Sequence, residues 1–297
     1  MDITAGHLLL SYIEENLKNR HKLRQEWESL QSYIPEGCTT KVATLQENKS
    51  KNRYPDALPY DQNRVKLDPT KSVTGSDYIN ASYIVDVDPH HPRYIATQGP
   101  LSNTIDDFWQ MVWERNITAI VMLTPVTDMG LSQSSQYWAS NGVATYNIYE
   151  VRLVSEHPHS DDYIIRSFYL QNSQTRESRT VTHFQYLTWT SLGAPPTATP
   201  LLEFRRKVNK ACSNPKTPLL VHCSGGVGRT GTYMLIDMAL SRIQSGAKEI
   251  NLAASVEYLR DHRPHMVKTK LQFEFALSAL VEETHAMLDA ARQRAMH

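Results

Sequence analysis

The chain has 297 residues, of which 40% are apolar and 21% are charged. This composition is typical of a folded domain with one large core, and it excludes a disordered or fibrous protein. The 31 Lys and Arg residues balance the 31 Asp and Glu residues, so the formal net charge is zero. That balance argues against broad electrostatic binding to nucleic acid, although it permits a local basic pocket.

The three cysteines, Cys38, Cys212 and Cys223, include no close pair, which argues against a disulfide framework and indicates a reducing compartment. No Cys/His spacing suits zinc, so we expect no metal and no cofactor. The longest apolar run, 117–123, is too short to cross a bilayer, and the first 30 residues lack a signal-sequence pattern. We therefore expect a cytosolic-facing domain, with any membrane anchor in sequence outside this chain.

Apolar residues recur at helical spacing through the first 34 residues. They are Leu9, Ile13, Leu17, Leu23, Trp27 and Leu30. We expect an N-terminal helical segment, residues 1–35, packed on a main domain of residues 36–297. The polar residues 35–52 predict a loop, and no change of period there marks a domain boundary.

The rest of the chain alternates between strand-like and helix-like segments. Strands are expected at 78–79, 94–96, 117–123, 146–155, 162–170, 179–189 and 219–221. Helices are expected from Asn103-Thr104 through Trp113 and at 230–243, 252–261 and 270–290. Polar residues 171–178 would join two of the strands as a hairpin. Strands interleaved with long helices predict a single α/β domain with a mixed sheet.

The most informative segment is 221–231, Val-His-Cys-Ser-Gly-Gly-Val-Gly-Arg-Thr-Gly. Cys223 stands at the tip of an expected strand, and Arg229 opens the expected helix. The small residues between them let consecutive backbone N–H groups form an anion cradle, to which the helix N-terminus adds positive potential. The cradle residues are Ser224, Gly225, Gly226, Val227 and Gly228.

This segment predicts a nucleophilic cysteine. Arg229 can form two hydrogen bonds to a phosphate, and Thr230 can donate its hydroxyl to the sulfur. The same field would hold the pKa of Cys223 below its free value of about 8.5. A bare Cys-x5-Arg pattern is a weak signal, but the strand, Gly-rich turn and helix around it disfavour a structural cysteine. A nucleotide-binding loop is also disfavoured, because no Lys follows the glycines.

Five further segments resemble core motifs of the Cys-dependent protein tyrosine phosphatases. They are 51–56 (Lys-Asn-Arg-Tyr-Pro-Asp), 77–82, 97–100, 107–109 and 272–275. Together with 221–231 they occur in the family's order, the likeness extends over nearly all of the chain, and the chain is identified as a member of this family. Segments 203–210 and 272–277 most resemble the receptor-type tyrosine-protein phosphatase-like N subfamily, the islet autoantigen and phogrin group of secretory-granule membrane proteins. The resemblance implies a central twisted mixed sheet flanked by helices.

The resemblance also implies roles around the pocket. Tyr54 would stack on the substrate ring and set the depth of the pocket, while Asp56 would hold the peptide backbone. Lys268 stands where the family has the Gln that orients the hydrolytic water, and Gln272 is the second family glutamine. His222 would hydrogen-bond the backbone and hold the Cys223 loop in shape.

The catalytic set is incomplete in the acid loop, residues 189–195. The family acid is the Asp of a Trp-Pro-Asp sequence, whereas this chain has Trp189-Thr190-Ser191, keeping the Trp hinge but not the acid. Gln133 replaces a family Lys, and Asp128 is the expected, shortened partner of Arg229. Positioned acid–base catalysis is worth about 10²–10⁴-fold per step, so turnover should suffer severely while binding persists.

The nucleophile loop itself points toward activity. Vertebrate members of the subfamily have an Asp directly after the Ser of this loop, where it repels phosphate. This chain has Gly225 there, and Val227 where they have Ala, so the loop resembles that of an active phosphatase.

Three hypotheses follow. The first is a pseudophosphatase, inactive or very weakly active, that binds a phosphotyrosine-containing protein or peptide and acts in secretory-vesicle regulation. The second is a slow but genuine phosphatase on phosphotyrosine or a phosphoinositide; Lys268 suits the phosphoinositide, whereas Tyr54 implies a narrow, deep pocket. The third is a plain interaction domain with a vestigial pocket.

The resemblance further implies a setting for the domain. It would belong to a single-pass secretory-vesicle membrane protein whose transmembrane segment lies outside this chain. A homo- or heterodimer with related receptor phosphatases is the implied protein partner, and no nucleic acid is expected.

Overall fold

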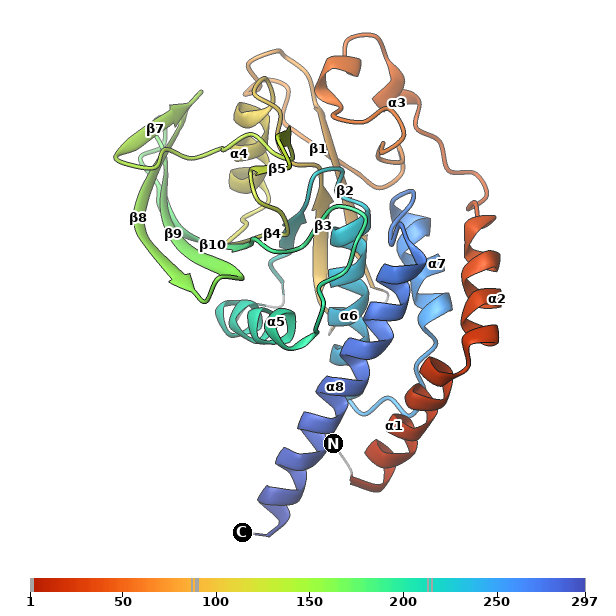
Figure 1. Ribbon diagram of the computed structural model, residues 1–297. Coiled ribbons are helices and arrows are strands. Elements are labelled where there is room, and N and C mark those ends of the chain that lie inside the picture. The colour runs from red at the N-terminus through yellow and green to blue at the C-terminus, as the bar shows by residue number, and fades with distance from the viewer. Residues whose placement is uncertain (1–2, 87, 89–90, 213, 215, 297) are drawn as a thin grey trace.

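A computed structural model describes residues 3–86, 88, 91–212, 214 and 216–296, and a nine-stranded mixed sheet runs through its middle (Figure 1). The strand order is β1-β2-β3-β11-β4-β10-β9-β8-β7. The central strands β3, β11, β4 and β10 are parallel, and the outer strands pair antiparallel. The strands are β1 (Arg64–Lys66), β2 (Tyr78–Val85), β3 (Arg93–Thr97), β4 (Ala119–Met122), β7 (Val143–Tyr146), β8 (Tyr149–His159), β9 (Tyr163–Asn172), β10 (Ser178–Tyr186) and β11 (Leu219–His222). A separate hairpin joins β5 (Thr127–Asp128) and β6 (Leu131–Ser132).

Helices cover both faces of the sheet, with α4 on one side and α5 to α8 on the other (Figure 1). The helices are α1 (Ile3–Lys18), α2 (Arg20–Gln31), α3 (Lys41–Thr44), α4 (Ile105–Glu114), α5 (Thr199–Ala211), α6 (Gly228–Gln244), α7 (Leu252–His262) and α8 (Lys270–Ala295), with a short 3₁₀ turn, η1 (Lys49–Lys51). None of the described helices combines the length and apolar character needed to cross a bilayer.

The central strands are buried on both faces, and β4 shows how their side chains divide between two cores. Ala119 and Val121 point into the core under α5 to α8. Ile120 and Met122 point into the core under α4. This alternation is the two-residue period of a strand, and the continuous apolar run at 117–123 satisfies both faces at once. The expected α/β fold with a mixed sheet flanked by helices is confirmed.

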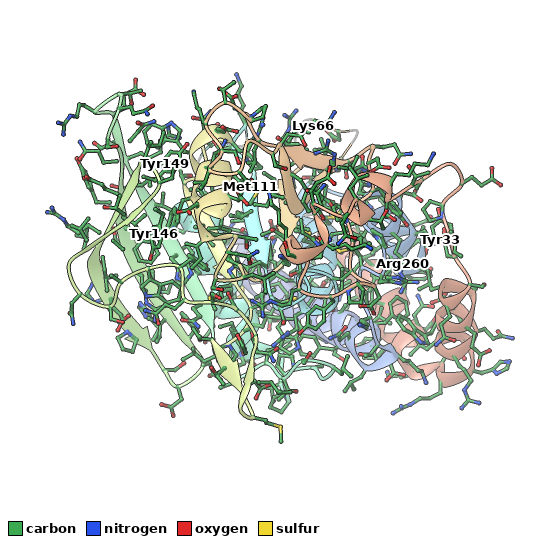
Figure 2. All side chains as sticks on the ribbon, turned by 90° about the horizontal axis from the view of Figure 1, so that it is seen from above. Tyr33, Lys66, Met111, Tyr146, Tyr149 and Arg260 are labelled. Atoms are coloured by element: carbon green, nitrogen blue, oxygen red, sulfur yellow. The ribbon has the colours of Figure 1, made fainter. Side chains whose placement is uncertain are left out.

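The N-terminal helical pattern forms two helices, α1 and α2, rather than one. They meet at Asn19, whose side chain accepts a hydrogen bond from the Lys22 backbone N–H and so caps α2. Helix α1 packs on α8, and α2 packs on α7. The carbonyl of Leu30 accepts a hydrogen bond from Arg260, and Tyr33 donates to Asp261 at 2.5 Å. Tyr33 and Arg260 lie at one end of the molecule, far from Tyr146 and Tyr149 (Figure 2).

Three further boundaries differ from the sequence expectation. The strand expected at 146–155 is two strands, β7 and β8, because the chain turns at Asn147 with φ 55°. The strand expected at 179–189 ends at Tyr186, so Trp189 lies in the following loop. The polar stretch 35–52 contains α3 and the 3₁₀ turn η1.

Candidate active site

The nucleophile loop, residues 223–229, lies at the carboxyl end of the central parallel strand. Strand β11 pairs with β3 on one side and β4 on the other, and Cys223 follows its last residue. Helix α6 begins at Gly228, so its N-terminus points at the loop. The carboxyl edge of parallel strands is where α/β sheets place their ligand sites, and a helix N-terminus there favours an anion.

Two contacts explain why the loop needs a glycine and turns as it does. Gly226 has φ +70°, and a Cβ there would lie 2.2 Å from the Thr97 carbonyl oxygen, so only glycine fits. Arg263 donates hydrogen bonds to the carbonyls of Gly226 at 2.9 Å and Gly225 at 3.1 Å. Because the N–H of a trans peptide points away from its carbonyl, the N–H groups of Gly226 and Val227 face the opposite side, toward the pocket.

Arg263 is the support of the loop that the sequence reasoning missed. It is fully buried and also donates to Asn80 Oδ1 at 2.7 Å and Ser82 Oγ at 3.0 Å, which ties the loop to β2. Burial lowers the pKa of Arg263 to about 10, so it stays charged at neutral pH. No local sequence pattern marks this arginine, because its partners come from distant segments.

Cys223 is 3% exposed and lies in an environment that favours its anion. Burial raises the pKa of the thiol, but the charge of Arg229 and hydrogen bonds from Thr230 and the Gly226 N–H outweigh it, so the pKa of Cys223 lies below its ordinary value. Among the described residues, the buried Thr230 hydroxyl has no other hydrogen-bond partner. It is therefore available to the sulfur.

Arg229 is buried, and its guanidinium is held from three directions. It donates to Thr124 Oγ1 at 3.0 Å, to the Trp189 carbonyl at 2.9 Å and to Gln133 Oε1 at 3.0 Å. The expectation that Asp128 pairs with Arg229 is wrong, because Asp128 lies in the β5–β6 hairpin with a short side chain and Gln133, just after β6, takes that place. A neutral partner leaves the positive charge of Arg229 for a bound anion.

The acid loop is docked against the start of α8. The Trp189 indole donates to the Gly193 carbonyl at 2.8 Å, which closes the loop on itself. Gln272 Nε2 lies 3.4 Å from the Ser191 carbonyl and 3.3 Å from that of Gly193, and Thr269 Oγ1 donates to the Leu192 carbonyl at 3.2 Å. Ser191 and Leu192 consequently line the pocket above Cys223.

The pocket is small and its mouth is polar. Its volume is about 180 Å³, and Tyr54, Asp56, Ser191, Cys223 and Lys268 are among its lining residues. Tyr54 is 37% exposed, and its hydroxyl lies 2.8 Å from Ser224 Oγ. Lys268 Nζ lies 3.7 Å from Asp56 Oδ2 across the mouth. Asp56 is the only carboxylate among the described lining residues.

His222 supports the loop from behind. Its Nδ1 lies 3.0 Å from the Cys223 carbonyl oxygen, and its Nε2 lies 2.8 Å from the Tyr137 hydroxyl. Burial lowers the pKa of His222 to about 4, so the ring is neutral at physiological pH. It can therefore orient the loop but adds no charge to it.

Residues 97–100, noted in the sequence only as a family motif, buttress the loop from the other side. The Gly99 N–H donates to the Ser224 carbonyl at 2.8 Å. A Cβ on Gly99 would lie 2.6 Å from the Gln133 carbonyl oxygen and 2.8 Å from that of Cys223. Arg53 donates to the Gly99 and Pro100 carbonyls at 3.0 and 2.7 Å and thereby anchors the segment that carries Tyr54.

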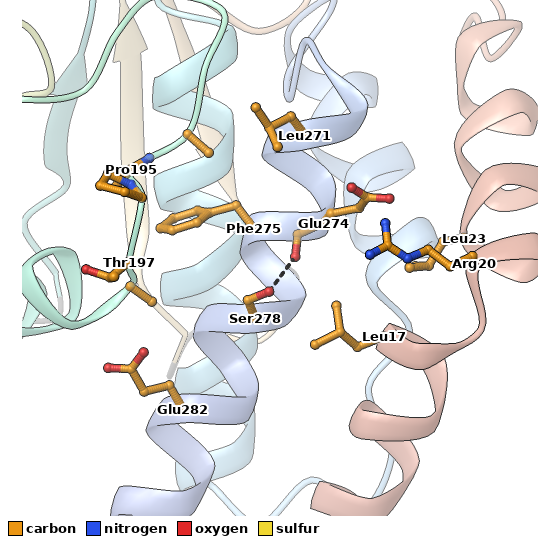
Figure 3. A pocket seen from close by; sticks show the side chains of 13 residues that line it. Leu17, Arg20, Leu23, Pro195, Thr197, Leu271, Glu274, Phe275, Ser278 and Glu282 are labelled. Carbon is orange, nitrogen blue, oxygen red and sulfur yellow. Dashed lines mark hydrogen bonds between the residues drawn. The ribbon is translucent and has the colours of Figure 1, made fainter.

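A larger hollow, of about 640 Å³, lies elsewhere (Figure 3). It is formed where the end of the acid loop, α8 and the junction of α1 and α2 meet, with Pro195, Phe275 and Leu17 on its three sides. Neither Cys223 nor Arg229 lines it. In the part of the chain that the structure describes, no three His, Cys, Asp or Glu side chains are grouped as metal ligands would be.

The buried cysteine with a lowered pKa, the anion cradle and the helix N-terminus are the features that a Cys-dependent phosphatase places on an α/β fold. A family model described as protein-tyrosine phosphatase matches residues 48–282. The chain belongs to the protein-tyrosine phosphatase family.

Known relatives agree with the expected subfamily. The chain is 53% identical to the human receptor-type tyrosine-protein phosphatase-like N over 293 residues, 99% of this chain and 30% of that protein. It is 54% identical to the receptor-type tyrosine-protein phosphatase N2 of Macaca nemestrina, covering 99% of this chain and 29% of that protein. It is 38% identical to the receptor-type tyrosine-protein phosphatase-like ida-1 of Caenorhabditis elegans, covering 97% and 37%. The chain thus spans about a third of the length of these relatives.

Proposed function

We propose that this domain binds phosphotyrosine-containing proteins or peptides at Cys223 and hydrolyses them very slowly or not at all. One observation carries the proposal. The pocket keeps its cradle, Cys223 and Arg229, but its only described carboxylate, Asp56, is paired with Lys268 at the mouth, and Ser191 stands on the acid loop. The pocket therefore has the N–H donors and the positive charge that bind an anion, but it has no acid that could protonate a leaving phenol.

The binding half of the proposal is supported by the lining. The cradle amides and Arg229 match a phosphate dianion. Tyr54, fixed on Ser224 at the mouth, offers a ring face to an aromatic substituent, and Asp56 offers an acceptor to a peptide N–H. The pocket volume of about 180 Å³ suits a narrow group such as a phosphorylated phenol.

The catalytic half follows from the proton balance of two steps. In the first, the Cys223 thiolate attacks phosphorus and the phosphorus–oxygen bond to the phenol breaks, leaving a phenolate that needs a proton. In the second, water must lose a proton as it attacks the phosphocysteine. The Ser191 hydroxyl is not an acid at neutral pH, so it does not protonate the leaving phenolate. In the second step neither this hydroxyl nor an ammonium at Lys268, which has no free lone pair, takes the proton of the water, so each step loses about 10²–10⁴-fold.

The second candidate is a slow but genuine phosphatase acting on phosphotyrosine or a phosphoinositide. The lowered pKa of Cys223 favours it, because a lower pKa increases the fraction of nucleophilic thiolate at a given pH. Gly225 also favours it, since it places no charge beside the cradle. Lys268 at the mouth would suit a phosphoinositide with additional phosphates.

Calorimetry with a phosphotyrosine peptide tests the binding half, with the unphosphorylated peptide as control. We expect binding by the wild type and its loss in Arg229→Ala. Arg229→Lys is the matched variant, because it keeps the charge and removes the two-pronged hydrogen bonding. Equal affinities of all three proteins would refute the proposal and support a vestigial pocket. Steady-state turnover of the same peptide decides between the two candidates.

We also propose a setting for the domain. Residues 1–35 form an N-terminal segment packed on a domain of residues 36–297; residues 1–2, 87, 89–90, 213, 215 and 297 of these ranges lie outside the described part. The domain faces the cytosol in a single-pass secretory-vesicle membrane protein and forms homo- or heterodimers with related receptor phosphatases. The receptor-type names of the relatives, and the third of their length that this chain spans, support the membrane setting.

A further inference from the structure

A line of buried polar side chains connects strand β9 with the nucleophile loop. The Tyr137 hydroxyl lies between two imidazoles, 2.7 Å from His183 Nε2 and 2.8 Å from His222 Nε2. At one end, His222 Nδ1 lies 3.0 Å from the Cys223 carbonyl oxygen. At the other end, His183 Nδ1 lies 3.5 Å from Arg166 Nη1. All of these residues are buried, and they come from separate segments of the chain.

Both histidines are neutral. Burial lowers the pKa of His222 to about 4 and holds the pKa of His183 well below its ordinary value, with Arg166 and the other histidine adding to the effect at His183. A neutral imidazole has one N–H donor and one acceptor nitrogen. Each ring in this line must therefore donate on one side and accept on the other.

The two ends of the line fix its direction. The Cys223 carbonyl only accepts, so His222 carries its proton on Nδ1 and accepts at Nε2. The Tyr137 hydroxyl then donates to His222 and accepts from His183, whose proton is on Nε2. His183 Nδ1 is left as an acceptor, and it faces Arg166, which only donates. The thioether of Met122, 3.9 Å from the Tyr137 oxygen, is a weaker alternative acceptor.

Arg166 is held firmly at the outer end. It donates from Nε to Glu156 Oε2 at 2.6 Å and from Nη1 to Gln185 Oε1 at 2.7 Å. Its guanidinium also lies over the Trp138 ring, 4.7 Å from the ring centre. These contacts fix the donor that faces His183.

A second branch leads from Arg166 to the other functional residue of the loop. Gln185, which accepts from Arg166, donates to the Thr124 carbonyl at 3.1 Å. Thr124 Oγ1 in turn accepts from Arg229 at 3.0 Å. Arg166 therefore lies at the start of two buried hydrogen-bond paths, which end at Cys223 and at Arg229.

We propose that Arg166 is a positioning residue for the nucleophile, acting through His183, Tyr137 and His222. In every hydrogen bond of the line, the donor lies on the Arg166 side and its N–H or O–H points toward Cys223. Each of these bond dipoles therefore has its positive end toward the loop. The line fixes the orientation of the Cys223 peptide and favours the thiolate. The effect on the nucleophile rests on the proposed function, in which Cys223 acts as a thiolate. The direction of the hydrogen bonds in the line follows from their partners alone and does not depend on that function.

Several other charged and titratable groups lie near the line. Arg229, Thr230 and Arg263 surround Cys223, Arg53 and Arg229 act on His222, and Arg166 and His222 act on His183. None of the described carboxylates acts on either histidine in the reverse direction. Changes at Arg166 therefore reach Cys223 through the line, through Gln185 and Thr124 to Arg229, or through space, and the experiment separates the line from the other two routes.

The direct test is the tautomeric state of the two rings, measured by long-range ¹H–¹⁵N NMR of histidine-labelled protein. His183→Gln and His222→Gln assign the signals. We expect a proton on Nδ1 of His222 and on Nε2 of His183. A proton on Nε2 of His222 would reverse the line and overturn the proposal, whatever the outcome of the phosphotyrosine-binding experiment.

The functional test follows alkylation of Cys223 by iodoacetate against pH. Arg166→Met removes the donor and should raise the midpoint by about half a pH unit, which is about threefold less thiolate below the midpoint. Arg179→Met is the matched control, because Arg179 also lies over a tryptophan ring, 3.8 Å from the Trp113 ring centre, on the neighbouring strand β10. We expect no shift in this control.

Tyr137→Phe separates the two routes, because it interrupts the line without changing any charge. We expect the same upward shift of the midpoint as in Arg166→Met. A shift in Arg166→Met alone would show that the effect travels through space or through Thr124 and Arg229 and not along the line, which would overturn the proposal, as would unchanged midpoints in both variants. If Arg166→Met fails to fold, Tyr137→Phe and the tautomers of the wild type still decide.

Discussion

Restoring a carboxylate at position 191 should restore turnover, because the acid loop is already docked over the pocket. Gln272 and Thr269 hold its carbonyls, and Arg229 holds that of Trp189. A new acid in Ser191→Asp would therefore enter an ordered segment that lines the pocket. We combine it with Thr190→Pro, which stiffens the same segment.

The turnover rate on phosphotyrosine should rise by the effect of one positioned proton transfer. That effect is about 10²–10⁴-fold, or about 3–5 kcal/mol of activation free energy. Lys268 limits it, because its ammonium would attract the new carboxylate and keep it ionised, when the first step needs the protonated acid. Lys268 is already paired with Asp56 at 3.7 Å, and the new carboxylate would compete for it. The triple variant with Lys268→Gln should thus gain at least about 10²-fold and exceed Ser191→Asp/Thr190→Pro.

Leaving-group dependence is the assay that identifies the missing acid. A fluorinated aryl phosphate has an acidic phenol that leaves without protonation, so the wild type should cleave it much faster than phosphotyrosine, with a burst followed by slow phosphocysteine hydrolysis. In the triple variant the cleavage rates of the fluorinated aryl phosphate and of phosphotyrosine should differ less than in the wild type. Ser191→Asn is the matched control, since it has the shape of Asp without a transferable proton. If the triple variant binds the peptide normally but stays as slow as the wild type, the acid-loss argument is wrong.

The same geometry leads to expectations for alkylation, for one cradle variant and for stability against pH. Iodoacetate should alkylate Cys223 with a midpoint well below the free-thiol value of about 8.5, and a midpoint at that value would contradict the environment described. Gly225→Asp should weaken phosphotyrosine-peptide binding in calorimetry by about 10-fold or more, because its carboxylate would repel the phosphate. Its Tm should change little, because the new Cβ would lie at an ordinary contact distance of 3.4 Å from the Tyr54 ring. Urea unfolding of the wild type should show a free energy of unfolding that falls as the pH drops from 6.5 toward 4. The reason is that folded His222, with a pKa of about 4, stays neutral in this range while the ring in the unfolded chain becomes protonated. This difference lowers the free energy of unfolding by up to about 3 kcal/mol. Burial raises the pKa of Asp107 from 3.8 to about 6, so this carboxyl binds a proton more readily in the folded state and stabilises it as the pH falls. Asp107→Asn removes this contribution and should make the free energy of unfolding fall more steeply with decreasing pH. An unchanged pH dependence would refute the raised pKa of Asp107.

The nucleophile loop was predictable because its parts are contiguous in sequence. A buried strand, small residues and a helix start within 221–231 already fix which atoms meet, and the structure has Cys223 and Arg229 where that order requires. The strand–helix alternation predicted the fold class for the same reason, since periodicity is a local property. Boundaries were less predictable, because the break between α1 and α2 at Asn19 depends on a side-chain cap as well as on the spacing of the apolar residues.

The partners of the loop were not predictable, because they arrive from distant parts of the chain. Gln133 reaches Arg229 across 96 positions, whereas the resemblance to the family had favoured Asp128. Arg263 lies 37 residues after the Gly226 carbonyl that it holds, with no motif around it. Such contacts depend on how separate elements pack, which a single sequence does not display.

The same separation explains how the domain keeps a binding site without its acid. The cradle is built by Arg263, Gly226 and the Gly99 segment, all of which lie outside the acid loop. The acid loop contacts the cradle chiefly through its Trp189 carbonyl on Arg229, a backbone group that does not depend on the side chain at position 191. On the proposed function, Ser191 therefore removes a proton donor from the reaction without loosening the anion site.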